Sequence, residues 1–174
     1  GLSEKPLVNF VGFQLYWWAC ILLENNASII CLILLSAHLY FHSKPKQETC
    51  FMIVLAGLGL IVDSILTLLG IYQFNNVQTL QLPPLWLVFL WLGFATNISL
   101  LSKFKYAVQW RLLALAGGLL APLSYIAAGK LGAVAFPNGY AITWTILFAV
   151  WFVLLPALFF VCYYLSEPQY DSQT

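Results

Sequence analysis

An aspartate interrupts the apolar stretch AGLGLIVDSILTLLGIY, residues 56–72. Read as a helix from about Cys50 to Tyr72, the stretch has the ~20 residues needed to cross ~30 Å of hydrocarbon. At about 1.5 Å per residue, Asp63 then lies about 20 Å from the start of the helix, slightly past the middle of the membrane. Because a lipid-facing acid at that depth is costly, we expect Asp63 to face protein or water.

Asp63 needs hydrogen-bond partners, and the apolar stretches contain no Lys or Arg that could supply a cation. Counted along the helices, Tyr125 lies at about the same depth, ~20 Å, and Trp17 and Trp18 lie at about 15 to 17 Å. We therefore predict that Asp63 is buried against the first and fifth spans, is neutral at about pH 7 and lies within reach of Tyr125. Two interpretations of its role remain open: a structural hydrogen bond between spans three and five, or an acid that handles protons or binds a lipid headgroup.

Two further features of the predicted spans bear on a site, a pair of amide side chains and a proline. Gln14 and Asn97 are about 8 to 11 Å from the inner face, where they form a second polar layer. Pro122 stands in mid-span and removes a backbone hydrogen bond, so we expect a kink there. A kink beside Ser124 could open a cavity, or it could serve only to shape the bundle.

Deep tryptophans are candidates for the wall of an apolar pocket. Indole rings commonly anchor a protein at the membrane interface, but four of them lie too far inside the spans for that role. They could enclose a lipid tail or an isoprenoid, although filling the protein core is the commoner use of such rings. These residues are Trp17, Trp18, Trp91 and Trp151.

Two histidines near the inner end of the second span are the candidates for metal ligands. His38 and His42 are four residues apart, a spacing that places both imidazoles on one face of a helix. Glu48 or Cys50 could supply a third ligand, but no HExxH motif is present. The simpler interpretation is a pair of amphipathic rings at the membrane interface, so we predict neither a metal nor any other cofactor.

Small residues form two stripes at helical spacing, and such stripes let helix backbones approach closely in membranes. One stripe shares the face of Asp63 and the other runs along the fifth span. The first stripe comprises Ala56, Gly59, Thr67 and Gly70, and the second comprises Ala114, Gly117, Ala121, Ser124 and Ala128. We predict that both stripes pack against neighbouring helices.

The composition is that of an integral membrane protein. The chain is 62% hydrophobic and 7% charged, with a mean hydropathy of +0.89, which excludes a soluble domain with a solvated surface. A net charge of +1 without a basic, aromatic-rich run argues against a nucleic-acid partner. We predict an all-α protein, a compact bundle that forms a single membrane domain over residues 1–174. Its six spans are expected at about residues 7–23, 27–41, 50–72, 85–102, 112–129 and 141–165.

The basic residues predict the orientation of this bundle. Six spans place both termini and two of the loops on one side of the membrane. That side carries six of the seven basic residues, and the other side carries Lys130. Because cytoplasmic loops are enriched in Lys and Arg, we expect both termini to be cytoplasmic. The six residues are Lys5, Lys44, Lys46, Lys103, Lys105 and Arg111.

Four motifs combine polar and aromatic positions and together cover most of the spans: NFVGFQLYWW, DSILTLLG, PPLWLVFLWLGFAT and APLSYIAAGKLGA. They resemble a bacterial inner-membrane family known as domain of unknown function 2878. One departure is Ala121, where the family pattern leads us to expect Gly. The resemblance implies a multi-pass protein of the bacterial inner membrane and carries over no catalytic residue. The positions that match the family pattern are Gln14, Trp18, Asp63, Trp91, Pro122 and Tyr125.

Three functions are compatible with these residues. The first is a protein that binds membrane lipids or another membrane protein, as an accessory to a lipid-modifying system, with Asp63 as a buried neutral acid. The second is a small proton-coupled transporter, favoured by Asp63 and Pro122. The third is an intramembrane enzyme that modifies a lipid. The first is preferred, because a lone acid without a partnered His or metal is a poor catalyst and no other catalytic residue is apparent.

Overall fold

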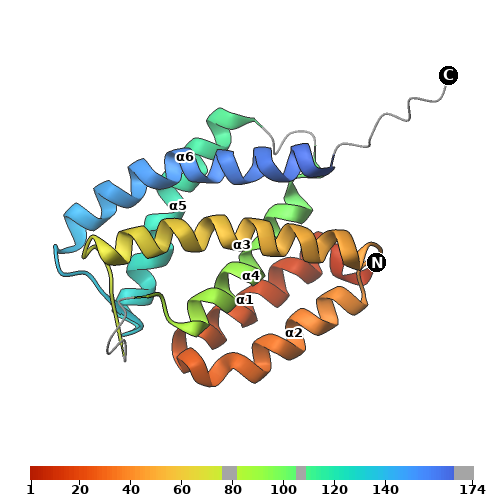
Figure 1. Ribbon diagram of the computed structural model, residues 1–174, viewed down its shortest axis with the longest axis horizontal. Coiled ribbons are helices and arrows are strands. Elements are labelled where there is room, and N and C mark those ends of the chain that lie inside the picture. The colour runs from red at the N-terminus through yellow and green to blue at the C-terminus, as the bar shows by residue number, and fades with distance from the viewer. Residues whose placement is uncertain (76–81, 105–108, 167–174) are drawn as a thin grey trace.

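The computed structural model describes residues 1–75, 82–104 and 109–166 (Figure 1). Within these residues the chain forms six α-helices, two short 3-10 turns and a pair of two-residue strands. The helices are α1 (Pro6–Leu23), α2 (Ser28–Tyr40), α3 (Pro45–Leu68), α4 (Leu85–Leu101), α5 (Trp110–Lys130) and α6 (Tyr140–Ser166). The 3-10 turns are η1 (Leu2–Glu4) and η2 (Glu24–Ala27), and the strands are β1 (Gln73–Phe74) and β2 (Val134–Ala135).

In the part of the chain that the structure describes, four helical stretches are long and apolar enough to cross a membrane: Pro6–Tyr40, Pro45–Leu68, Trp110–Lys130 and Tyr140–Ser166. The first stretch comprises α1 and α2, and α4 is a shorter apolar helix of 17 residues. The prediction of an all-α membrane protein is therefore confirmed. With 13 residues, α2 is about 20 Å long, shorter than the hydrocarbon core.

The helix that carries Asp63 differs from the predicted range 50–72. It begins at Pro45, because proline is favoured in the first helical turn, and it ends at Leu68, just before Gly70 with its φ of +79°. Asp63 therefore precedes the end of α3 by five residues, or about 8 Å, and is not near the middle of the helix. The acid lies toward the end of the bundle where α3 joins α4.

The connections between helices gather at two ends of the molecule (Figure 1). The N-terminus, the α2–α3 connection and the end of α6 lie at one end, and η2, the start of α4 and the α5–α6 connection lie at the other. There β1 pairs antiparallel with β2, with Gln73 opposite Ala135 and Phe74 opposite Val134. This ladder joins the segment after α3 to the segment after α5.

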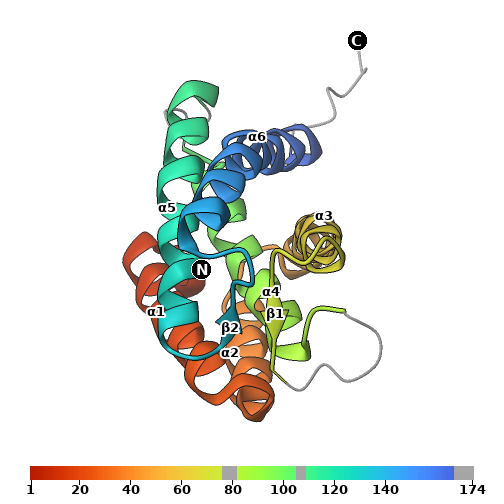
Figure 2. The same ribbon diagram turned by 90° about the vertical axis from the view of Figure 1, so that its left-hand side faces the viewer.

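Two helix pairs dominate the packing, α3 with α4 and α5 with α6. Figure 2 shows α6 on the opposite side of α4 from α2. The predicted small-residue stripes lie at these contacts. A Cβ atom on Gly59 would lie 2.3 Å from the Trp91 ring of α4, and one on Gly117 would lie 2.5 Å from the Trp151 carbonyl oxygen of α6. Gly70 and Ser124, which complete the predicted stripes, are exposed and take no part in this close packing.

Candidate functional site

Asp63 is buried, with 1% of its surface exposed, and two aromatic side chains bind its carboxyl group. The indole Nε1 of Trp91 donates to Oδ2 at 2.7 Å, and the hydroxyl of Tyr125 lies 2.9 Å from both oxygens. No cation pairs with Asp63 among the described residues. The acid thus joins α3 to α4 and α5 through neutral donors.

The predicted contact of Asp63 with Tyr125 is therefore present, but the predicted contact with the first span is replaced by one with α4. The Trp91 ring reaches the acid because Gly59, one turn earlier on α3, has no side chain in its path. Trp91 also stacks on Trp151 of α6, with ring centroids 5.5 Å apart and an interplanar angle of 7°. Trp91 consequently connects α3, α4 and α6 at one point.

Tyr72 covers the acid on the side of the β1–β2 ladder. Its ring stacks on Tyr125 with centroids 5.2 Å apart and planes 8° apart, and it is 2% exposed. The Tyr72 hydroxyl and the Trp151 indole nitrogen are buried without a hydrogen-bond partner among the described residues. Buried polar groups are usually paired, so these two atoms are available to a water or a ligand.

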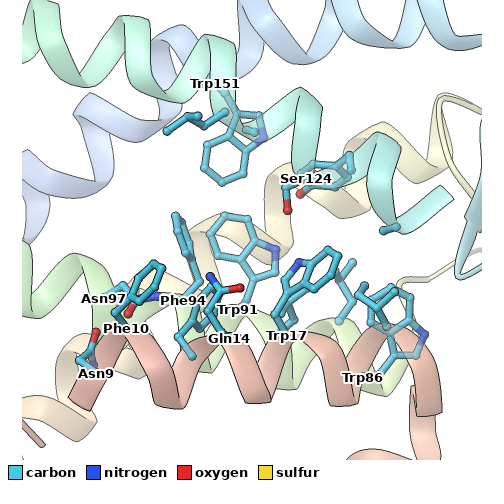
Figure 3. A pocket seen from close by; sticks show the side chains of 18 of the residues that line it. Asn9, Phe10, Gln14, Trp17, Trp86, Trp91, Phe94, Asn97, Ser124 and Trp151 are labelled. Atoms are coloured by element: carbon cyan, nitrogen blue, oxygen red, sulfur yellow. The ribbon is translucent and has the colours of Figure 1, made fainter. Parts of the chain in front are cut away.

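A cavity of about 510 Å³ lies beside this cluster, between α1 and α4 on one side and α5 and α6 on the other. Its volume is within the usual range of about 300–1,000 Å³ for ligand pockets. Figure 3 shows Gln14 and Trp17 of α1 facing the side of the cavity that carries Ser124 and Trp151. Trp91 and Tyr125 form part of the wall, so the cavity is in contact with the partners of Asp63.

Most of the candidate residues meet at this cavity. Those that line it are Gln14, Trp17, Trp91, Asn97, Ser124, Tyr125 and Trp151. Asp63 lies behind its two partners, and two further candidates, Trp18 and Pro122, are also outside the lining. Trp18 points away from the cavity with 47% of its surface exposed, because it is one residue, about 100° of helix turn, past Trp17. Pro122 is buried in α5, which continues through it to Lys130.

A second buried acid, Glu48, lies on the same face of α3, near its start, and is 2% exposed. His38 Nε2 lies 3.3 Å from Oε1, His42 Nε2 lies 3.0 Å from Oε2, and the Ser99 hydroxyl donates to Oε2 at 2.7 Å. The two histidines do not share a helix face as predicted, because α2 ends at Tyr40 and His42 lies in the α2–α3 connection. Their rings still meet, with centroids 5.5 Å apart.

Burial lowers the pKa of the His42 imidazole, although the nearby carboxylates of Glu48 and Glu4 act in the opposite direction. The sequence contained a signal for Glu48. Continuing the buried stripe of α3 back from Gly59 through Ala56 and Met52 at helical spacing leads to this acid. Placing the start of the helix at Cys50 hid that continuation.

Comparison with known proteins finds one matching family model. No curated protein and no solved structure matches the chain. The model of the family described as "Protein of unknown function (DUF2878)" matches residues 6–157, a range that includes Asp63, Trp91, Tyr125, His38, His42 and Glu48. The resemblance drawn from the four motifs is therefore confirmed, and the chain belongs to the DUF2878 family.

Proposed function

We propose that this protein binds a membrane lipid, with one acyl or isoprenoid chain held in the cavity between α1, α4, α5 and α6. The observation that carries the proposal is the lining of that cavity. Within the described part of the chain it is built from aromatic and aliphatic side chains with a few neutral polar ones and no charged residue. Such a lining suits an apolar chain, and a few polar groups suffice to orient it.

The polar groups of the lining are placed to receive a polar part of the lipid. The side-chain amides of Gln14 and Asn97 both line the cavity and make no hydrogen bond to another described residue. The Ser124 hydroxyl lies on the α5 side, in view of Gln14 in Figure 3. An ester or hydroxyl of the ligand would provide the partners that these groups lack.

The cavity is accessible from the side of the bundle. Phe10 of α1 and Leu120 of α5 both line it, yet they are 60% and 63% exposed. Both residues lie within helical stretches that are long and apolar enough to cross a membrane, so this opening faces hydrocarbon. A lipid chain could enter directly from the bilayer without crossing water.

Binding is favoured over catalysis by the residues that are missing from the lining. No Asp, Glu, His or Cys lies among the described residues that line the cavity, and Asp63 reaches it through Tyr125 and Trp91. A proton-coupled carrier is the second candidate, because Asp63 is a buried acid without a cation that connects α5 to α3 and α4. If the protein is a carrier, the substitution Asp63→Asn, which removes the titratable group, should abolish pH-driven flux.

Native mass spectrometry of the protein released from mild detergent tests the proposal. We expect a retained lipid of one class in the unmodified protein, and loss of that lipid in Ser124→Trp, where an indole fills the cavity. Leu123→Trp is the matched control, since Leu123 is the neighbouring residue on α5, is 53% exposed and lies outside the lining. An empty unmodified protein, or equal lipid retention by both variants, would overturn the proposal.

We further propose that the protein resides in a bacterial inner membrane as six spans with both termini in the cytoplasm. Lys5, Lys44 and Lys46 lie at the end of the bundle with the N-terminus, as the basic-residue count requires, and Lys130 lies at the other. Lys105, which was included in that count, lies outside the described residues. Because α2 and α4 are short, whether each of them crosses the membrane is the part of this proposal that most needs a test.

Cysteine labelling in whole cells measures this orientation. We expect an impermeant reagent to label Asn138→Cys and to leave Lys103→Cys unlabelled, in a background where the exposed Cys50 is replaced by Ser. Both positions are exposed, in the α5–α6 connection and just after α4. The opposite labelling pattern would place the termini outside, and labelling of both positions from outside would contradict the six-span arrangement.

A further inference from the structure

The end of the bundle that holds the N-terminus carries a second cluster of side chains with ligand chemistry, none of which lines the cavity. His38 from α2, His42 from the α2–α3 connection and Glu48 from α3 each offer one atom, and these atoms lie within 4.8 Å of one another. The chain contains two histidines in all, and both converge on the same carboxylate. We propose that these three residues bind one divalent transition-metal ion of the zinc type.

The spacing of the three atoms fits a single ion. Zinc binds nitrogen at about 2.0–2.1 Å and carboxylate oxygen at about 2.0–2.2 Å, so adjacent ligands of a tetrahedral site lie about 3.4 Å apart. The two imidazole Nε2 atoms lie 3.3 and 3.0 Å from the Glu48 oxygens. Small rotations of the side chains would open these contacts to receive the ion. Two His and one Glu are also a known ligand set for zinc that leaves one position open.

The charge at the cluster also favours a cation. Glu48 is 2% exposed, and its printed partners are two imidazoles and a serine hydroxyl. No Lys or Arg makes an ion pair with it among the described residues. A buried carboxylate is stable when it is paired with a cation or coordinates a metal. A divalent ion between Glu48 and the two imidazoles would supply that charge.

Two neighbouring residues are placed to orient the ligands. The Ser99 hydroxyl donates to Glu48 Oε2 at 2.7 Å, and the carboxylate of Glu4 lies 3.2 Å from His42 Nδ1. Metal-bound imidazoles commonly donate their second ring N–H to a carboxylate, which fixes the ring orientation. In the structure, Nδ1 accepts from the backbone N–H of Lys44 at 3.0 Å. Metal binding would place the proton on Nδ1, facing Glu4, and leave the Lys44 N–H to water.

Zinc titration of the purified full chain tests this site. The protein carries a purification tag without histidine and the Cys50→Ser substitution, is stripped with a chelator, incubated with Zn²⁺ and desalted, and its zinc is then measured by elemental analysis. We expect one zinc per chain, and an X-ray absorption spectrum with nitrogen and oxygen ligands. Glu48→Gln should lose the zinc, whereas Glu24→Gln, the matched change at the opposite end of the bundle, should keep it.

His38→Gln provides a second test, because a 13%-exposed side chain can be replaced with less risk to folding than the buried Glu48. It should also lose the zinc. Glu4→Gln should retain one zinc per chain with affinity weakened about 10–100-fold, as expected for a residue that orients a ligand. An unmodified protein that binds no zinc, or zinc retained in both Glu48→Gln and His38→Gln, would overturn the proposal.

Discussion

The two buried acids of α3 lie on one helix face, 15 residues apart, and are stabilised in different ways. About 22 Å of helix separates them, and α4 supplies one partner to each: Trp91 to Asp63 and Ser99 to Glu48. The remaining partners differ. Asp63 is bound by a tyrosine beside an apolar cavity, whereas Glu48 is bound by two imidazoles next to an exposed connection.

The different partners of the two acids indicate what each acid can do. Indole and phenol groups donate hydrogen bonds but bind a metal ion poorly, so the Asp63 cluster is suited to holding helices together or to holding a proton. Imidazoles are good ligands for transition metals and leave their second nitrogen free for a further contact. We therefore propose the lipid site in the cavity beside the Asp63 cluster and the metal site at Glu48.

The largest effect on stability is expected at Asp63. Asp63→Leu strands the Trp91 N–H and the Tyr125 hydroxyl, and each buried unpaired donor costs about 1–3 kcal/mol, which gives a loss of about 2–6 kcal/mol. Asp63→Asn keeps an acceptor and should cost much less. Unfolding in detergent would measure both variants, and equal stability would show that the two donors find other partners.

Infrared difference spectroscopy adds a direct measurement of protonation at the same residue. If Asp63 is neutral, as predicted from the absence of a cation, a protonated-carboxyl band should be present at about neutral pH and should vanish in Asp63→Asn. A carboxylate band from Asp63 under the same conditions would contradict the neutral acid. In that case its two aromatic donors alone would stabilise the charge.

Metal binding should produce the next largest effect and should separate the two acids. At a free zinc concentration of 100 times Kd, a metal that binds the folded state stabilises it by about 2.7 kcal/mol. We expect this increase in the unmodified protein and in Asp63→Asn, and none in Glu48→Gln. Thermal melting with zinc and with chelator measures it. A loss of the zinc response in Asp63→Asn would mean that the two ends are not independent.

The sequence predicted the Asp63 end better than the Glu48 end, for physical reasons. Depth along the helices depends only on a constant rise per residue, so it placed Tyr125 opposite Asp63 correctly. It does not describe the direction or reach of a side chain, and Trp91 was considered as a pocket wall and not as a donor. Glu48 was missed as a core residue because polar sequence around it, PKQET, is typical of a loop, although Pro45 begins the helix there.

A medium effect is expected where Trp91 crosses α3. An added methyl group at Gly59 would overlap the Trp91 ring, and overpacking of this kind costs about 1–3 kcal/mol, so Gly59→Ala should be destabilised by that amount. Gly57→Ala is the matched control, because no atom lies within 4 Å of its new Cβ and alanine is favoured over glycine by up to about 1 kcal/mol in a helix. Equal melting temperatures would show that Trp91 can move away from Asp63.

The smallest effects are expected from removing a single hydroxyl at each acid. Tyr125→Phe leaves Asp63 its bond from Trp91, and Ser99→Ala leaves Glu48 its two imidazoles, so each should cost about 1 kcal/mol. Their specific effects should differ. Tyr125→Phe is expected to weaken lipid retention in native mass spectrometry and to leave zinc affinity unchanged. Ser99→Ala is expected to weaken zinc affinity and to leave the lipid in place, because Ser99 does not line the cavity. If either variant impaired both measurements, α3 would couple the two ends, and the cavity and the metal would have to be treated as one site.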